Sequence, residues 1–249
     1  MVIIVDMSKQ SIHDEVYAKP RNMIVDFAFD DTVVKVFPDM IRRSVPGYTE
    51  IITLLGLLAE QYGQSGSRCY DLGCSLGAAT LSMRQRIPAD CTIVAVDNSQ
   101  SMIDSCAEHV FDDGKANVEL YCQNIQDTDI TDASVVVLNF TLQFIEPDER
   151  LSILQKIAAG LRPGGVLVLS EKLNFTDAQE QQVQDDLQLA FKRANGYSDL
   201  EISQKRSALE KVLIPDSFEQ QQQRLHEAGF SQVYQWFQAF NFVSILAIK

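Results

Sequence analysis

Between residues 68 and 170 the sequence alternates repeatedly between short apolar segments and segments with helical character. The apolar segments are rich in Val, Ile and Leu and carry few polar residues. Such strands, separated by helices, are typical of a parallel sheet that is covered by helices on both faces. The strands that we expect are 68–72, 92–96, 117–122, 134–138 and 166–170.

The segments on either side of this region complete the predicted fold. Tyr48–Tyr62 has apolar residues at helical spacing and is followed by Gly63, so we expect an amphipathic helix there. After a polar, helical insertion at about 173–214, two further strands at 232–237 and 241–248 are expected to form an antiparallel pair. We therefore predict an α/β fold with a seven-stranded, mostly parallel sheet.

The expected domain organisation is simple. Residues 36–249 form a single α/β domain in this interpretation. Residues 1–35 are polar and lack clear periodicity, so we interpret them as an N-terminal extension and assign them no role.

Composition excludes several classes of protein. The chain has 21 Lys and Arg against 34 Asp and Glu, a net charge of −13, which argues against a basic module that binds nucleic acid through its phosphates. Five cysteines without a CxxC pair predict neither a disulfide framework nor a structural zinc site. No apolar run approaches the roughly 18 residues of a membrane span. We expect a cytoplasmic protein that binds no metal, membrane or nucleic acid directly.

The strongest local signal is a glycine-rich loop after the first expected strand, Gly73-Cys74-Ser75-Leu76-Gly77. Glycines at this edge of a parallel sheet let a ligand approach the main chain closely. Asp71 lies two residues before the loop, where it would repel a pyrophosphate but suit a ligand that carries an ammonium and a sulfonium. The loop therefore favours S-adenosylmethionine over a dinucleotide, although a tight turn without a ligand remains an alternative.

Three further strand ends carry polar candidates. Asp97 follows the second strand and could accept hydrogen bonds from two ribose hydroxyls, or it could cap the next helix. Asn124 and Ile125 follow the third strand and could contact an adenine edge, or they could form a turn. Asn139 follows the fourth strand, with a turn as its alternative. Ligands of open α/β sheets bind at the carboxyl ends of the strands, so these positions together predict a class I S-adenosylmethionine-dependent methyltransferase fold.

Catalytic groups are harder to find in the sequence. His13, His109 and His226 lie away from the expected strand ends. Lys192, Arg193 and Lys205 belong to the inserted segment, among seven acidic residues, and we favour a solvated helix face for them over a functional site.

Several long segments closely resemble the carboxy-S-adenosyl-L-methionine synthase family. The resemblance extends from about Val36 to the end of the sequence and is far more specific than the glycine-rich loop. It is carried by VFPDMIRRSVPGY (36–48), YDLGCSLGAATLS (70–82), NFTLQF (139–144), LVLSEK (167–172) and FKRANGYSDLEISQKR (191–206).

This resemblance implies an activity and a set of ligand-binding residues. Members of the family convert S-adenosyl-L-methionine and prephenate to carboxy-S-adenosyl-L-methionine, phenylpyruvate and water, and a partner enzyme uses the product to make uridine 5-oxyacetic acid at the tRNA wobble position. The resemblance also implies a homodimer. The ligand-binding positions that it implies are Tyr48, Gly73, Cys74, Ser75, Asp97, Asn98, Asn124, Ile125, Asn139 and Arg206.

Arg206 has a special role in this family, where an arginine binds the carboxylate that is added to the methyl group. A guanidinium suits this task because it forms two charge-assisted hydrogen bonds with a carboxylate. The family mechanism needs no base from the protein, since prephenate supplies the hydroxide or carboxylate that removes a methyl proton.

Two points stay open at the level of the sequence. Asn124 stands where many members have Asp, and we expect at most weaker binding of S-adenosylmethionine. The cation that holds prephenate could be Arg42, Arg43, Lys192 or Arg193. The alternatives to a synthase are an ordinary methyltransferase for a small molecule or a tRNA base, and a protein that binds S-adenosylmethionine without turnover.

Overall fold

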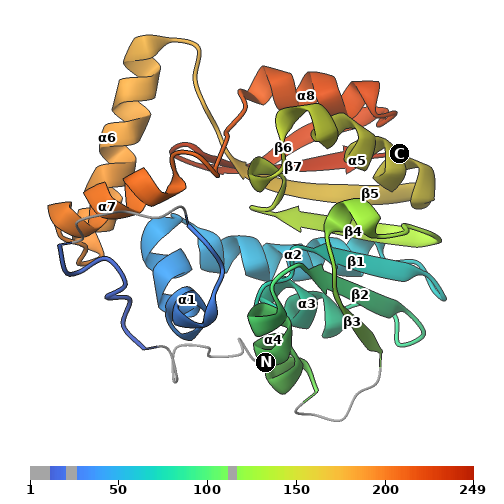
Figure 1. The fold of residues 1–249 in the computed structure, drawn as a ribbon. Coiled ribbons are helices and arrows are strands. Elements are labelled where there is room, and N and C mark those ends of the chain that lie inside the picture. Colours follow the sequence, from blue (N-terminus) through green and yellow to red (C-terminus); the bar gives the residue numbers. More distant parts are fainter. Residues whose placement is uncertain (1–11, 21–26, 112–116) are drawn as a thin grey trace.

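The computed structural model describes residues 12–20, 27–111 and 117–249. Its centre is a seven-stranded sheet with the strand order β3-β2-β1-β4-β5-β7-β6 (Figure 1). Neighbouring strands are parallel, except that β7 pairs antiparallel with β5 and β6, as predicted. The strands are β1 (Arg68–Leu72), β2 (Thr92–Asp97), β3 (Val118–Cys122), β4 (Ala133–Asn139), β5 (Leu161–Lys172), β6 (Gln232–Ala239) and β7 (Phe242–Ile248).

Strand β4 shows why a nearly continuous apolar segment becomes a central strand. Every residue from 133 to 138 has an exposed fraction of 0%. Val135 and Val137 contribute to one apolar cluster, while Val136 and Leu138 contribute to a second cluster. Because successive side chains point to opposite faces, such a strand needs apolar residues at every position.

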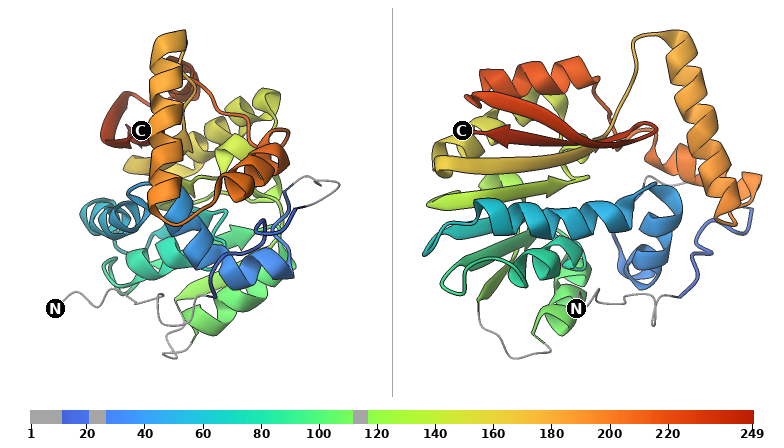
Figure 2. Two further views of the ribbon diagram at one scale, coloured as in Figure 1. Left: turned by 90° about the vertical axis from the view of Figure 1, so that its left-hand side faces the viewer. Right: turned by 180° about the vertical axis from the view of Figure 1, so that it is seen from behind.

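Helices cover both faces of the sheet, and α2 lies along the strands in the right-hand view of Figure 2. Residues of α2, α3 and α4 share one cluster with the sheet, and residues of α5 and α8 share the other. The helices are α1 (Asp31–Ser44), α2 (Tyr48–Tyr62), α3 (Ala78–Arg84), α4 (Gln100–Val110), α5 (Pro147–Gly160), α6 (Ala178–Ala194), α7 (Asp199–Leu209) and α8 (Phe218–Glu227).

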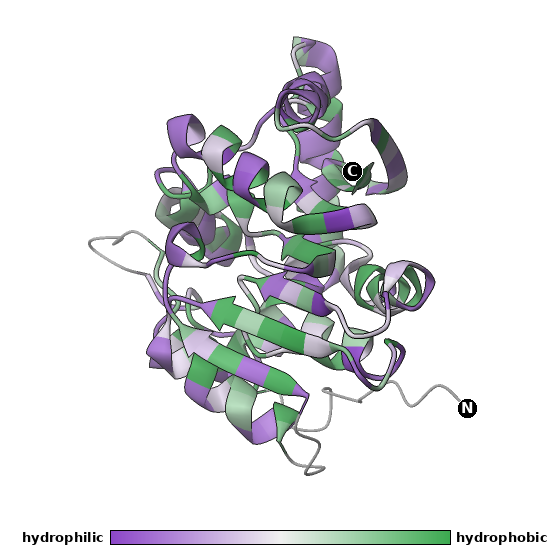
Figure 3. Ribbon diagram, turned by 90° about the vertical axis from the view of Figure 1, so that its right-hand side faces the viewer, coloured by the Kyte–Doolittle hydropathy of each residue, from purple (hydrophilic) through white to green (hydrophobic). Residues whose placement is uncertain are grey.

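The hydropathy of the chain follows this layering. In Figure 3 the strands are mostly green, whereas the helices carry purple residues on many of their outward positions. None of the helices in the described ranges has the length and apolar character needed to cross a membrane.

Helices α6 and α7 form the expected insertion after β5. Figures 1 and 2 show α6 standing away from the sheet on the side where the parallel strands end. Gln188 is the one buried residue of this helix, and Val183 and Leu187 are 55% and 41% exposed. α6 is therefore attached to the rest of the domain along only part of its surface.

Helix α1 was not expected from the sequence. It begins after Asp30, whose side chain accepts hydrogen bonds from the backbone NH groups of Thr32 and Val33. The helix crosses residue 35, so no break in secondary structure lies at the expected boundary between extension and domain. The part of the extension at 1–11 and 21–26 lies outside the described residues.

Candidate active site

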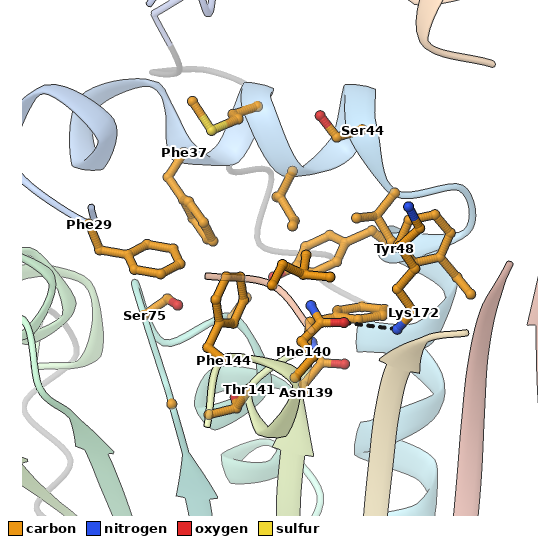
Figure 4. A pocket seen from close by; sticks show the side chains of 18 of the residues that line it. Phe29, Phe37, Ser44, Tyr48, Ser75, Asn139, Phe140, Thr141, Phe144 and Lys172 are labelled. Carbon is orange, nitrogen blue, oxygen red and sulfur yellow. Dashed lines mark hydrogen bonds between the residues drawn. The ribbon is translucent and has the colours of Figure 1, made fainter. Parts of the chain in front are cut away.

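A cavity of about 820 Å³ lies at the carboxyl ends of the parallel strands (Figure 4). Helices α1 and α2 border it, as do α6 and α7. Nine of the ten ligand-binding positions that the resemblance implies line this cavity, and Asn124 is the exception. The nine are Tyr48, Gly73, Cys74, Ser75, Asp97, Asn98, Ile125, Asn139 and Arg206.

The glycine-rich loop is fixed to the end of β2. The backbone NH groups of Gly73 and Cys74 both donate to the carbonyl of Val96, at 2.8 and 2.9 Å. Gly73 has a φ of +87°, and a Cβ at this position would collide with the side chain of Thr141. Glycine is therefore required here both by the backbone conformation and by the close approach of the neighbouring loop.

Asp97 connects the glycine-rich loop with the residue at the start of α4. Its carboxylate accepts hydrogen bonds from the backbone NH groups of Ser75, at 3.0 Å, and Ser99, at 2.9 Å. Ser99 is the N-cap of α4, so the alternative that Asp97 caps this helix is wrong. Burial raises the pKa of Asp97, although these backbone hydrogen bonds oppose the shift.

Asp71 lies next to this loop and also lines the cavity. It is 1% exposed and accepts a 2.6 Å hydrogen bond from the hydroxyl of Thr80. Burial raises the pKa of Asp71 to about 6, and the hydrogen bonds from Thr80 oppose this shift. Near neutral pH the cavity thus contains a buried carboxylate that a cation would stabilise.

Asn98, Asn124 and Ile125 form one corner of the site. The amide of Asn98 donates to the side-chain oxygen of Asn124 at 3.2 Å. Asn124 is the N-cap of a single 3-10 turn, η2 (Ile125–Asp127), so the turn that was the alternative is present. Ile125 nevertheless lines the cavity, and Asn124 contacts a residue that does.

Asn139 ends β4 and lies beside Phe140 and Thr141 on the wall of the cavity (Figure 4). Its side-chain oxygen is buried and forms no hydrogen bond with a described residue. A buried acceptor without a donor costs free energy, so this atom is suited to a ligand that donates a hydrogen bond.

Tyr48 is the first residue of α2 and lines the cavity, where the centroid of its ring lies 6.4 Å from that of Phe140 (Figure 4). Burial raises the pKa of Tyr48 above its usual range, and the negative charge of Asp71 adds to the shift. Its hydroxyl therefore stays protonated and can donate a hydrogen bond at physiological pH.

Cations gather on the side of the cavity that β5, α6 and α7 form. Lys172, Lys192, Lys205 and Arg206 all line this side. Arg206 is exposed, and its guanidinium forms no ion pair or hydrogen bond with any residue in the described ranges. Among these four, Arg206 was a predicted binding residue and Lys192 was one of the candidates for binding prephenate, whereas Lys172 and Lys205 were neither.

The expectation of a solvated helix face is wrong for Lys205, while Lys192 is half-buried and lines the cavity. Lys205 is 5% exposed, and its ammonium donates to the hydroxyl of Ser44 at 2.9 Å and lies 3.7 Å from the carboxylate of Asp14. Burial lowers the pKa of Lys205 to about 7. Arg193 does behave as expected, because it is exposed and pairs with Asp199 at 2.8 Å.

The four candidates for binding prephenate therefore separate into two groups. Arg42 and Lys192 line the cavity, whereas Arg43 and Arg193 do not. Arg43 is instead buried in a network in which it pairs with Asp39 at 3.1 Å.

An aromatic wall of the cavity was missed from the sequence. Phe29 forms edge-to-face contacts with Phe27, Phe37 and Phe144, with ring centroids 5.1, 6.1 and 5.6 Å apart. All four rings line the cavity, and the labelled ones point into it in Figure 4. Two adjacent aspartates at 30 and 31 could have signalled the start of α1 behind this aromatic segment.

Metal ions have no evident place in this arrangement. Within the described ranges, no group of three or more His, Cys, Asp or Glu side chains could hold one.

Comparisons with known proteins agree with the fold. A family model described as a methyltransferase domain matches residues 70–165. Human N-acetylserotonin methyltransferase, solved in complex with SAM, aligns with a TM-score of 0.56 at 16% identity. The alignment covers 85% of this chain and 54% of the human chain, and at this identity it supports the fold alone.

Two relatives are far more similar in sequence. The carboxy-S-adenosyl-L-methionine synthase of Trichlorobacter lovleyi is 59% identical over 239 residues, which cover 95% of this chain and 98% of the relative. The protein of the same name from Marinobacter nauticus is 57% identical over 242 residues and covers 96% of both chains. This chain therefore belongs to the carboxy-S-adenosyl-L-methionine synthase family, within the methyltransferase superfamily.

Proposed function

We propose that this enzyme converts S-adenosyl-L-methionine and prephenate to carboxy-S-adenosyl-L-methionine, phenylpyruvate and water. The observation that carries the proposal is Arg206, an arginine in the same cavity as the strand-end residues and without a partner among the described residues. A guanidinium is suited to a carboxylate, and S-adenosylmethionine has none at its methyl group. The names of the relatives support the same activity.

The residues at the strand ends fit S-adenosylmethionine. Asp71 would attract its ammonium and sulfonium charges, and Asp97 would accept hydrogen bonds from its ribose hydroxyls. The unpartnered oxygen of Asn139 would accept a further hydrogen bond from it. Asp71 and Asp97 are held in place by hydrogen bonds before a ligand arrives, which lowers the entropic cost of binding.

The second substrate supplies the chemistry in this proposal. When prephenate loses its ring carboxylate as carbon dioxide and its hydroxyl as hydroxide, the ring becomes aromatic. The hydroxide takes a proton from the sulfonium methyl group and becomes water, and the methyl carbon forms a bond with the carbon dioxide. Atoms and charge balance, and no external oxidant or reductant is needed.

The side chains of the cavity are suited to positioning rather than to proton transfer. No histidine of the described ranges lines it. Tyr48 stays protonated because its pKa is raised, so it serves as a hydrogen-bond donor. Phe29 and Phe144 place aromatic rings on the wall, where they would exclude water from a reactive carbon. Exclusion of water favours bond formation with carbon dioxide over return of the proton.

The proposed function also includes a second enzyme that uses the product. We propose that the product serves a separate enzyme that modifies the tRNA wobble uridine in the cytoplasm, since a net charge of −13 does not favour direct binding of RNA.

We also propose a homodimer that uses α6, where Val183 and Leu187 are exposed. Burial of exposed apolar side chains is the usual driving force for such a contact.

The proposal predicts a product whose formation depends on prephenate. Purified protein is incubated with S-adenosylmethionine, with and without prephenate, and the molecular mass of the nucleoside is measured by mass spectrometry. We expect the mass of an added carboxyl group only when prephenate is present. Methyl transfer to another acceptor, without a carboxylated product, would instead indicate an ordinary methyltransferase.

The variant Arg206→Ala tests whether this arginine binds the carboxylate of the product. We expect it to weaken binding of the carboxylated product by roughly 10- to 100-fold, since a charged hydrogen bond is lost, while binding of S-adenosylmethionine changes little. Arg193→Ala removes an exposed arginine outside the cavity and serves as the control. Equal losses of affinity for both nucleosides in Arg206→Ala would contradict the assigned role.

A further inference from the structure

Two carboxylates lie at strand ends in the cavity, and several cations lie on the wall that β5, α6 and α7 form. Asp71 and Asp97 lie at the ends of β1 and β2. Lys172 is the last residue of β5, and Lys192 and Arg206 lie in the last turns of α6 and α7. A chain with a net charge of −13 thus collects positive charge on one side of a single cavity.

The three cations lie close enough to influence one another. The positive charges of Lys172 and Arg206 both lower the pKa of Lys192, which burial already lowers, to about 8. Arg206 likewise lowers the pKa of Lys172. Asp185 of α6 acts in the opposite direction on both lysines. Lys172, Lys192 and Arg206 thus form a group of neighbouring cations on this wall of the cavity.

Mutual repulsion of this kind costs free energy unless an anion compensates it. The acids at the strand ends do not serve this purpose, because Asp97 is bound to backbone NH groups and Asp71 to Thr80. The cationic side of the cavity therefore has charge that an anionic second molecule would compensate.

We propose that Lys172 and Lys192 bind the carboxylates of the second substrate, a small organic dianion, and hold the carboxyl group that it loses beside Arg206. This inference rests on the proposed function, in which the second substrate is prephenate. Prephenate carries two carboxylates, and Lys172 and Lys192 offer one ammonium to each of them. This arrangement would also place the donor of the carboxyl group and the sulfonium methyl group in one cavity.

Binding of the second substrate should depend on pH through Lys192. Lys192 must be protonated to attract a carboxylate, and it faces Lys172 of β5, Lys205 and Arg206 of α7, and Asp185 of its own helix. Its pKa of about 8 means that the ammonium loses its proton above that pH. We expect the KM for prephenate to rise as the pH increases from 7.5 to 9 in the wild type.

The test uses Lys172→Met and Lys192→Met, which keep much of the side-chain volume and remove the charge. Two affinities are measured for each variant by titration calorimetry. One is the affinity for S-adenosylhomocysteine alone, and the other is that of prephenate for the complex with S-adenosylhomocysteine, which cannot react. Arg193→Met, a neighbouring cation on α6 that does not line the cavity, is the matched control.

We expect each lysine variant to bind prephenate roughly 10- to 100-fold more weakly and S-adenosylhomocysteine nearly as well as the wild type does. Arg193→Met should leave both affinities unchanged. Lys192→Arg should recover most of the prephenate affinity and should abolish its dependence on pH near 8, because an arginine keeps its proton.

Two other outcomes separate the inference from the proposed function. If the wild type forms carboxylated product while both lysine variants bind prephenate as the wild type does, the inference is wrong and the proposed function stands. If the variants lose affinity for S-adenosylhomocysteine instead, the lysines bind the amino-acid carboxylate of the nucleoside, which also overturns the inference. A wild type that neither binds prephenate nor forms product would overturn both.

Discussion

Two carboxylates at adjacent strand ends have different tasks because their partners differ. Asp97 accepts two backbone hydrogen bonds that connect the glycine-rich loop with the start of α4. Asp71 is buried with one hydroxyl partner, and burial raises its pKa to about 6. The fold therefore uses the charge of Asp97 for its own structure, whereas the charge of Asp71 is only partly stabilised by Thr80 and a cation would stabilise it further.

Asp71→Asn tests this distinction. A buried acid with a raised pKa favours the neutral form, so the cost of burying its charge appears as the pH rises through about 6. At pH 8 we therefore expect Asp71→Asn to unfold at a higher urea concentration than the wild type, while it binds S-adenosylmethionine at least 10-fold more weakly.

The pH dependence provides the second half of this test. Binding of S-adenosylmethionine by the wild type should weaken as the pH falls from 7 to 5, because Asp71 becomes protonated. The variant should show no such change in this range. Asp129→Asn, an exposed acid outside the cavity, is the control. An affinity in Asp71→Asn equal to that of the wild type would exclude a role for this carboxylate.

Individual site residues were predictable where a local rule applies. Asp97 and Asn139 follow apolar strands of a parallel sheet, and such strand ends meet at one edge. Lys205 was misread because the insertion is polar and carries many acids, which is typical of a solvated face. Burial of this lysine depends on where α7 docks, and no local pattern in the sequence specifies that position.

At the scale of elements, the N-terminal segment helps to fix α7 beside the cavity. Asp14 is 1% exposed, and it accepts a hydrogen bond from the hydroxyl of Tyr197 and lies 3.7 Å from the ammonium of Lys205. Lys205 directly precedes Arg206 on α7. The contact therefore connects a segment far away in the sequence with the helix that carries the proposed carboxylate-binding arginine.

Asp14→Asn should loosen this connection. Removing one partner of a buried ion pair leaves the other uncompensated, and we expect a loss of unfolding free energy of about 2–3 kcal/mol. In Asp14→Asn the backbone amides of α7 should exchange hydrogen faster than they do in the wild type. The amides of α3, which is distant from Asp14 in the sequence, serve as the internal control and should exchange as in the wild type. Glu15→Gln makes the matched change at an exposed neighbour. Unchanged exchange in α7 of Asp14→Asn would show that the segment does not position this helix.

Helices and strands were predicted correctly where the sequence has a regular apolar pattern. The bounds of α2 and β1 agree with the expected ranges because each has a regular apolar pattern and ends at a glycine. Helix α1 was missed because it contains Pro38 and because Arg43 and Asp39, both polar, are among its buried residues. Its partners include α4 and α6 as well as the N-terminal segment, so its buried face is specified by distant parts of the chain.

At the scale of the whole molecule, the fold separates charge that the sequence mixes. The net charge of −13 gives no sign of a cationic site. The sheet places Asp71 and Asp97 at strand ends in the cavity, and the insertion brings its lysines and Arg206 to the wall that β5, α6 and α7 form. A cavity of this kind is suited to two substrates of opposite charge, which is the central claim of the proposed function.

The most direct measurement of this claim follows the carboxyl group itself. Prephenate labelled with ¹³C in the ring carboxylate is incubated with the enzyme and S-adenosylmethionine in a buffer that contains unlabelled bicarbonate. The proposed function predicts that the carboxylated nucleoside carries the label, because the carbon dioxide is captured within the cavity. An unlabelled carboxyl group, or a nucleoside that gains none, would contradict it.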